Sequence, residues 1–408
     1  MATPDSDMSP PAAPNPAAAS PPPPTAHLGD LALTFLRLGT ITFGGPAAHV
    51  ALMEDEFVRR RRWLTHAELL DMLAVANCIP GPSSTELAIF IGYRRAGLRG
   101  LLIAGTCFIL PAALLVGILA WAYVRYGSLP VTGAILYGVK PVVIAVIVQA
   151  IWRLGRTAVK TWLLGAVALA AGAASFLGAP PLAVLVLSGL ALLVARSATI
   201  RRNSPPLLPL LVPAPSLLAA LTTTSAATAA TTLPGAISLA RIFLTFLKVG
   251  SLLFGSGYVL LAFLRTELVE RLGFPEAKLL DAVAVGQITP GPVFTTATFI
   301  GYVMAGPLGA LVATIGIFLP AFVLVALCGP FLPRLRQSPR MSAFLDGLNA
   351  ASLALIAVVT WQLASAALVD IPTVVMAAVA AAILLFRPVN SAWLVLAGGV
   401  LGVVLPHH

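Results

Sequence analysis

The chain has 408 residues, of which 59% are hydrophobic and 10% are charged, and its mean hydropathy is +0.96. These values lie outside the range of water-soluble globular domains and predict an all-α integral membrane protein. The formal net charge of +10 does not indicate nucleic-acid binding, because the basic residues form short clusters at the ends of apolar runs, as in cytoplasmic loops.

Residues 1–28 begin the chain with a stretch that is rich in Pro, Ala and Ser. This stretch lacks both the basic start and the apolar core of a signal peptide, so we expect a disordered tail.

The rest of the chain contains an internal repeat, which fixes the architecture. The matched segments are Phe35–Pro46 with Phe246–Gly257, Asp71–Pro82 with Asp281–Pro292, and Phe90–Tyr93 with Phe299–Tyr302. We therefore predict two homologous halves, residues 29–202 and 239–408. A Pro- and Thr-rich linker at 203–238 joins them. Whether this linker contains a further membrane span is left open.

Each half is expected to begin with a Gly-broken helix, followed by a polar connection and an apolar segment that Pro-Gly-Pro interrupts. Four further apolar runs follow, which in the first half cover residues 101–124, 131–152, 162–177 and 181–195. A spanning helix needs about 20 apolar residues, so each run is long enough, or nearly so, to cross a bilayer. The whole chain is predicted to hold about 10 transmembrane helices.

The first Pro-Gly-Pro segment lies between two basic clusters, residues 59–62 and 94–99. A single crossing would place these clusters on opposite sides of the membrane, so the positive-inside rule favours a re-entrant hairpin with Pro-Gly-Pro at its tip. Five crossings plus one hairpin per half predict an inverted repeat. The basic residues of the second half support this only in part, with four inside against three outside.

The two Pro-Gly-Pro tips are the strongest candidates for an anion site. Proline ends one helix and begins the next well, and the first turn of a helix offers free N–H groups to an anion. The alternative is that Pro and Gly only kink the helices, but the motif recurs with a polar amide one turn earlier each time. The candidate ligands are Asn77, Gly81, Ser83, Ser84 and Thr85 in the first half and Gln287, Gly291, Thr295 and Thr296 in the second.

Two matched cations, Arg37 and Lys248, lie inside the first broken helix of each half. A cation at that depth costs about 2.5 to 3.5 kcal/mol on insertion scales, so we expect it to face a cavity or an anion. Snorkelling toward the membrane surface is the alternative. Gly44, Gly45 and Gly255 would let the backbone break there and approach the same cavity.

Lys140 and Glu86 have no charged counterpart in the other half. Lys140 is interpreted either as a substrate-attracting charge or as a lipid-facing side chain. Glu86 is a candidate for binding a coupling proton, because burial favours the protonated carboxyl group. Pairing of Glu86 with Arg37 is the alternative.

The remaining polar residues do not form a catalytic or metal site in the sequence. Asp71 and Asp281 are expected to cap helices near the membrane surface. The histidines are predicted to be solvated or interfacial and the cysteines to be small core residues; these are His27, His49, His66, His407 and His408, and Cys78, Cys107 and Cys328. Without a nucleophile, Walker or dinucleotide motif, neither an enzyme nor a cofactor is predicted.

The motifs closely resemble the chromate ion transporter family in its long form with two fused halves. The resemblance rests on FGGP at Phe43–Pro46, on PGP with a following GY that ends at Tyr93, on the run Asp281–Tyr302 and on GIFLP at Gly316–Pro320. It extends loosely over most of residues 31–387. The second half has FGSG in place of FGGP, which makes its contact with an anion less secure.

The resemblance implies proton-driven efflux of chromate through the bacterial inner membrane, which gives chromate resistance. The implied partners are chromate, protons and the lipid bilayer. Sulfate or another oxyanion is the alternative substrate, because sulfate has nearly the same shape. An intramembrane lipid-phosphate phosphatase is a distant alternative, since that chemistry needs a clustered acid, base and nucleophile. The oligomeric state, including a homodimer, stays open.

Overall fold

The computed structural model describes residues 27–43, 46–77, 79–200, 238–253, 257–328, 339–387 and 389–404. Nearly all of the predicted tail and of the predicted linker lies outside these ranges, as do Gly44, Gly45, Gly255 and Cys78. All regular secondary structure in the described ranges is helical, which confirms the predicted all-α class.

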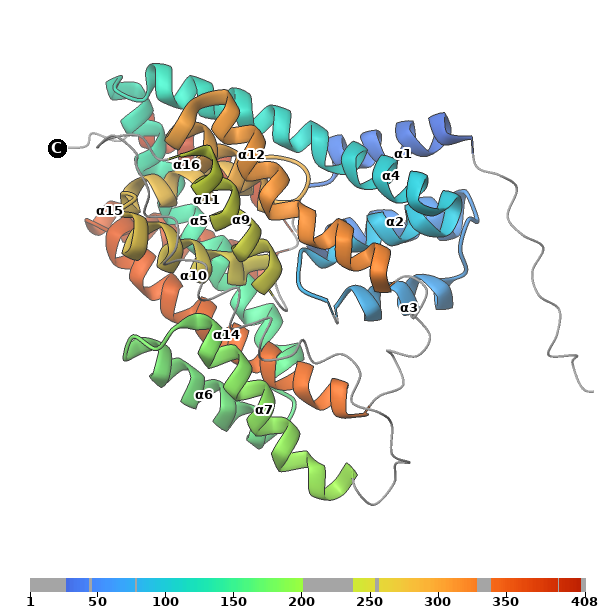
Figure 1. Ribbon diagram of the computed structural model, residues 1–408. Coiled ribbons are helices and arrows are strands. Elements are labelled where there is room, and N and C mark those ends of the chain that lie inside the picture. The colour runs from blue at the N-terminus through green and yellow to red at the C-terminus, as the bar shows by residue number, and fades with distance from the viewer. Residues whose placement is uncertain are drawn as a thin grey trace, which may run out of the picture.

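The first half contains seven α-helices in the described residues, with a π-helical turn at Asp55–Arg60. They are α1 (Leu28–Ile41), α2 (Pro46–Glu54), α3 (His66–Ala76), α4 (Ser83–Tyr126), α5 (Pro130–Ala158), α6 (Trp162–Phe176) and α7 (Pro181–Ile200). The break between α1 and α2 and the four later helices agree with the predicted elements. In Figure 1, α1 to α3 lie at one end of the molecule and α6 and α7 at another.

The second half repeats this order. Its helices are α9 (Leu239–Leu252), α10 (Leu260–Leu264), α11 (Glu276–Ile288), α12 (Thr296–Cys328), α14 (Pro339–Ala367), α15 (Ile371–Phe386) and α16 (Ser391–Val404). Within the described ranges, four helices are long and apolar enough to cross a membrane, namely Ser83–Tyr126, Pro130–Arg156, Val293–Leu327 and Arg340–Ala367. Four shorter apolar helices, α6, α7, α15 and α16, accompany them.

Local signals in the sequence explain several helix starts. Thr65 accepts a hydrogen bond from the Glu68 backbone N–H while the Glu68 carboxylate accepts one from Thr65, which is a capping box. Asp370 and Thr373 form the same arrangement at the start of α15. Pro130 occupies the first turn of α5, where its missing N–H costs nothing.

Helices α4 and α12 each double back at one sharp turn. The backbone leaves helical geometry at Ala96 and Gly97 (φ 56°) in α4, and at Ala305 and Gly306 (φ 63°) in α12. Glycine adopts such positive φ values without a steric penalty. In α4, a Cβ on Gly100 would lie 2.0 Å from the Gly92 carbonyl oxygen, so two glycine faces pack directly against each other. The same contact recurs in α12.

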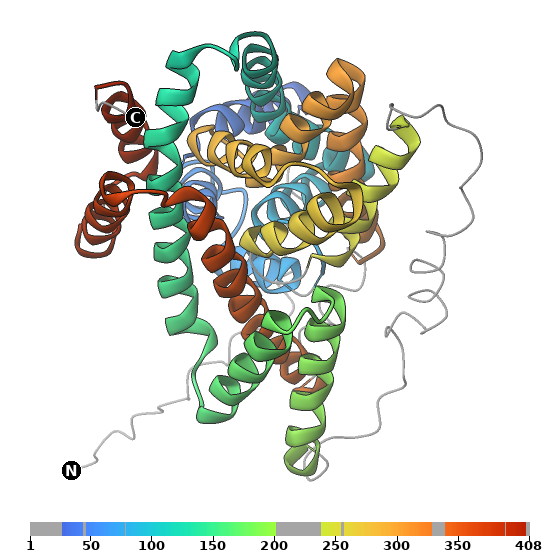
Figure 2. The ribbon, with the colours of Figure 1, turned by 90° about the vertical axis from the view of Figure 1, so that its left-hand side faces the viewer.

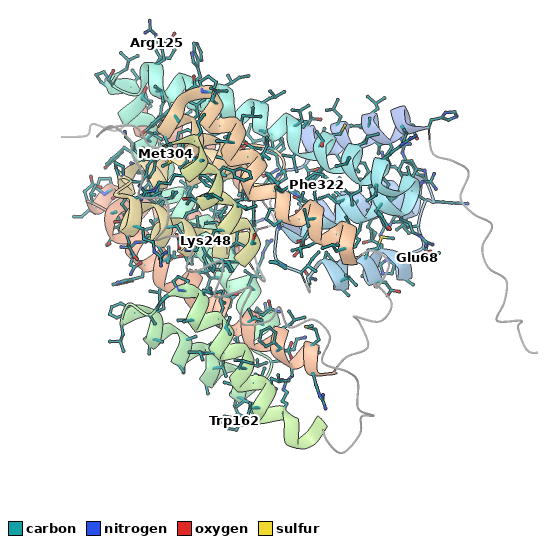
Figure 3. The ribbon with its side chains drawn as sticks, viewed as in Figure 1. Glu68, Arg125, Trp162, Lys248, Met304 and Phe322 are labelled. Carbon is teal, nitrogen blue, oxygen red and sulfur yellow. The ribbon has the colours of Figure 1, made fainter. Side chains whose placement is uncertain are left out.

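The two halves exchange their helices. Helix α5 of the first half packs against α15 and α16 of the second, and α14 of the second half packs against α6 and α7 of the first (Figure 2). Helices α4 and α12 pack against each other, with the Phe322 ring of α12 against Gly105 of α4 (Figure 3). Neither half therefore completes its packing alone.

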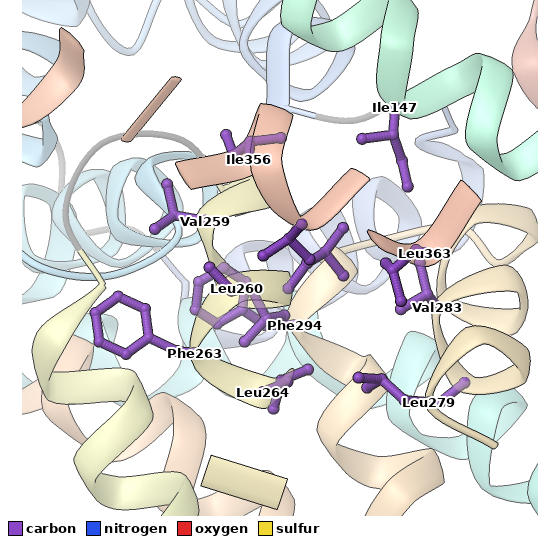
Figure 4. Close-up of a cluster of buried hydrophobic side chains, with 14 of the residues drawn as sticks. Ile147, Val259, Leu260, Phe263, Leu264, Leu279, Val283, Phe294, Ile356 and Leu363 are labelled. Carbon is purple, nitrogen blue, oxygen red and sulfur yellow. The ribbon is translucent and has the colours of Figure 1, made fainter. Parts of the chain in front are cut away.

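The largest buried apolar cluster lies where the second half meets α5. It includes Ile147 of α5, Leu260, Phe294 and Leu363, all of which are at most 1% exposed (Figure 4). In contrast, Trp162 and Leu177 at the ends of α6 are 85% and 87% exposed. Large exposed apolar side chains are expected where the solvent is lipid.

Candidate functional site

The two Pro-Gly-Pro tips bind to the opposite halves of the chain. The Gly81 N–H donates to the Leu253 carbonyl at 2.6 Å, and the Gly291 N–H donates to the Thr42 carbonyl at 2.9 Å. Thr42 and Leu253 are matched residues that directly follow α1 and α9. Each tip is therefore held at the break of the other half's first helix, which brings both tips together.

Both tip glycines have backbone conformations that disfavour a side chain. Their φ angles are 143° at Gly81 and 92° at Gly291. A Cβ on Gly81 would lie 2.3 Å from Oε1 of Glu86, and a Cβ on Gly291 would lie 2.7 Å from the Cβ of Ala112. Glycine is required at both tips by conformation and by space.

A small cavity lies between the tips. It is lined by His49, Pro82, Ser84, Gly257, Pro292, Val293 and Phe294. Its volume is about 10 Å³, which is roughly what one water requires. The helical segments that follow Pro82 and Pro292 both start at this cavity, because residues of their first turns line it.

The hydroxyl groups near the tips differ between the halves. In the second half, Thr295 and Thr296 donate to the carbonyls of Pro292 and Val293, at 2.8 and 2.7 Å. In the first half, the Thr85 hydroxyl is fully buried and has no hydrogen-bond partner among the described residues. Ser84 is buried and Ser83 is half-buried.

Glu86 is fully buried beneath the first tip. Neither of its carboxylate oxygens has a hydrogen-bond partner in the part of the chain that the structure describes. An ionised carboxylate without a partner is very costly in such a place. Within the described part of the chain, Glu86 forms no ion pair with Arg37, which was the alternative.

The two amides that precede the tips differ in their surroundings. Asn77 ends α3 and its side chain is exposed. Gln287 is half-buried, and its Nε2 atom has no hydrogen-bond partner among the described residues.

The matched cations have different surroundings. Lys248, which is labelled in Figure 3, forms an ion pair with Glu267 at 2.9 Å, and the two side chains are only 18% and 12% exposed. Arg37 is exposed and forms no ion pair with any described residue. It lines a second cavity with Asp55, Glu56 and Arg60, but Glu56 pairs instead with Arg61 at 2.7 Å.

Lys140 forms an ion pair across the two halves that neither interpretation of this residue included. Its Nζ lies 3.0 Å from Oδ1 of Asp281, and the Tyr123 hydroxyl donates to Oδ2 at 2.8 Å. The Asp281 side chain is 5% exposed and lies within α11.

The prediction that Asp281 caps a helix is wrong, because Pro275 holds the cap position. Asp71 likewise lies inside α3 rather than at its start.

His49 was missed as a site residue by the sequence reasoning, because it was predicted to be solvated or interfacial. It is 1% exposed, and its Nδ1 lies 3.0 Å from the Ser84 Oγ. The available signal was its place inside the apolar run 47–53.

The described residues contain no group of His, Cys, Asp and Glu side chains that could hold a metal ion.

Comparison with known proteins gives a consistent result over both halves. A family model described as "Chromate transporter" matches residues 29–193 and 240–403. A "Chromate transport protein" of Cupriavidus metallidurans is 35% identical over 397 residues, which is 94% of this chain and 96% of that protein. A "Probable chromate transport protein" of Synechococcus elongatus is 35% identical and covers 86% of this chain and 88% of its own length. No solved structure matches the chain.

Proposed function

The chain belongs to the chromate transporter family, and we propose that it exports chromate from the cytoplasm of a bacterium across the inner membrane, which gives chromate resistance. The relatives are described as chromate transport proteins, and the helical, strongly apolar fold is that of a multi-pass membrane protein. The observation that carries the proposal is the meeting of two helix N-termini at one cavity, held there by crossed hydrogen bonds between the halves.

The anion is proposed to bind between the two Pro-Gly-Pro tips. Helix N-termini supply backbone N–H groups and the positive end of the helix dipole, which suit an oxyanion. The cavity of about 10 Å³ is too small for a tetrahedral oxyanion, since it has room for roughly one water. The described conformation is therefore a closed one, and transport needs the tips to separate. Lys140 is left out of the proposed site, because Asp281 already neutralises its charge.

Export is the electrically favourable direction for this substrate. Moving one charge through about 100 mV is worth roughly 2.3 kcal/mol, so a dianion that leaves a negative interior gains about 4.6 kcal/mol. This corresponds to about three decades of concentration. Glu86 is the proposed proton-binding group, because its buried carboxyl group has no partner and lies directly beneath the tip of the first half.

We further propose that the halves form an inverted repeat that works by alternating access. Tyr137 and Gln149 of α5 hydrogen-bond Asp370 and Leu384, at the start and near the end of α15, so α5 and α15 run in the same direction. Helix α14 ends shortly before Asp370 and extends back toward α6 and α7 (Figure 2). The matched helices α5 and α14 thus run in opposite directions, as inversion requires.

Chromate uptake into everted membrane vesicles tests the proposed function. Vesicles that contain the chain are expected to accumulate chromate above a control without it, and an uncoupler tests the proton coupling. Arg37→Ala at equal protein level is expected to abolish uptake, because this exposed cation has no ion-pair partner among the described residues. Competition by sulfate distinguishes the two oxyanions. Wild-type vesicles that accumulate no chromate would refute the proposal.

A further inference from the structure

His49 stands out because it is buried at the central cavity and its Nε2 makes no well-formed hydrogen bond to a described residue. The Thr42 backbone, whose carbonyl accepts from the Gly291 N–H, is a further polar neighbour of the ring. His49 lines the cavity between the tips and is 1% exposed. Its Nδ1 lies 3.0 Å from the Ser84 Oγ, whereas Nε2 is buried and has no hydrogen-bond partner among the described residues. A buried polar atom without a partner is uncommon and costs about 1–3 kcal/mol. A side chain with such an atom that also lines a cavity is a candidate for binding a ligand.

The second half has no equivalent of this histidine. A spacing of 211 residues matches Arg37 with Lys248, and it also matches Arg62 (φ 51°) with Gly273 (φ 67°), which have the same unusual backbone conformation. At this spacing, Leu260 occupies the position of His49.

The partner of His49 differs between the halves in the same way. Counted from the Pro-Gly-Pro motifs, Phe294 occupies the position of Ser84. Leu260 and Phe294 both belong to the buried apolar cluster of Figure 4. The hydrogen-bonded pair of the first half is therefore replaced by two apolar side chains in the second.

This difference gives the central cavity one polar wall and one apolar wall. His49 and Ser84 form the polar wall, and Val293 and Phe294 belong to the apolar wall. A neutral imidazole has one N–H, and a Ser84 hydroxyl that donates to Nδ1 leaves that N–H on Nε2. With this tautomer, Nε2 carries a buried N–H without a well-formed hydrogen bond to a described residue, on a side chain that lines the cavity between the two helix N-termini.

We propose that His49 is a direct ligand of the transported oxyanion, donating a hydrogen bond from Nε2 while Ser84 orients the ring. The inference rests on the proposed function and makes it more specific, because it assigns the side-chain contacts of the anion to the first half. The second half then contributes backbone N–H groups and an apolar wall. The halves are unequal at the site even though their backbones match.

The test compares His49→Leu with His49→Gln. Leucine is the residue that the second half accommodates at this position, so it is expected to pack, while glutamine retains an N–H donor near the position of Nε2. Chromate uptake into everted vesicles is measured as a function of chromate concentration. The Leu variant is expected to raise the apparent KM about tenfold, the effect of one lost hydrogen bond to a charged group. The Gln variant is expected to stay within about threefold of wild type.

Leu260→Met is the matched control, because it changes a buried side chain at the same position of the other half. It is expected to leave the apparent KM unchanged. Thermal unfolding of each purified variant in detergent checks that the fold is retained. If His49→Leu is recovered poorly, His49→Met replaces it, since methionine also fills the space without an N–H.

Two results would overturn the assignment of His49: a Leu variant with the wild-type KM, or a Gln variant that is impaired as severely as the Leu variant. The stabilisation of purified protein by added chromate or sulfate separates this inference from the proposed function. If the wild type moves no chromate but either anion stabilises it, and His49→Leu removes that effect, the function fails while the ligand assignment holds. A wild type that neither anion stabilises and that transports nothing overturns both.

Discussion

Replacing Gly291 by alanine is expected to destabilise the protein through two separate effects. The φ angle of 92° is unfavourable for any residue with a Cβ, at a cost of about 1–3 kcal/mol. The new Cβ would also lie 2.7 Å from the Cβ of Ala112, and such overpacking typically costs a further 1–3 kcal/mol. Together, the two effects lower the free energy of unfolding by about 2–6 kcal/mol. The affected tip is the one whose Gly291 N–H donates to the Thr42 carbonyl at 2.9 Å.

Gly273→Ala is the matched control for this prediction. Gly273 also has a positive φ of 67°, but a Cβ there would meet no atom within 4 Å. Moreover, the first half has Arg62 with φ 51° at the matched position, so a side chain is tolerated in this conformation. Thermal unfolding of both variants in the same detergent isolates the clash with Ala112. Equal losses of stability in the two variants would refute the reasoning, because only Gly291 is crowded.

Three further predictions follow from the ion pairs and caps. Asp281→Asn should lower thermal stability by about 3 kcal/mol by leaving the Lys140 charge buried without a partner; the double variant with Lys140→Met should recover part of this loss, and additive losses would contradict the pairing. Glu267→Gln should destabilise more than Glu270→Gln, because Glu267 is 12% exposed in its pairs and Glu270 is 49% exposed; an equal effect in thermal unfolding would count against this. The Tyr137 hydroxyl and the Thr373 backbone N–H hold the pKa of Asp370 below its ordinary value, so their stabilising effect should be present near neutral pH and be lost as the pH falls below about 4. Tyr137→Phe should therefore flatten the acid side of the stability profile, and an unchanged profile would exclude this contribution.

Much of the fold could be predicted from the sequence, because apolar runs in lipid have few alternatives to the helix. The break after α1 and the helices α5, α6 and α7 lie close to where the Gly and apolar patterns place them. The exchange of α5 and α14 between the halves was not predictable in this way. It depends on which apolar faces fit each other, and one strongly apolar helix resembles another in composition.

In the candidate site, too, local features could be predicted from the sequence and long-range contacts could not. The Pro-Gly-Pro tips were predicted from local chain chemistry, since Pro and Gly restrict the backbone wherever they occur. The pairings of Lys140 with Asp281 and of His49 with Ser84 link residues that are far apart in the sequence, and hydrophobic periodicity carries no information about such contacts. Asp281 was therefore assigned to a helix cap, the commonest local role for an aspartate.

The packing of α5 against helices of the second half also determines when the first half can complete its folding during synthesis. The bond between Tyr137 of α5 and Asp370 joins residues that are 233 positions apart. At the usual translation rates of about 5–20 residues per second, roughly 10–50 s pass between the synthesis of α5 and that of α15. During that time the buried face of α5, which includes the polar side chain of Gln149, must be covered by lipid or by the insertion machinery. The first half thus enters the membrane early but completes its packing only at the end of synthesis.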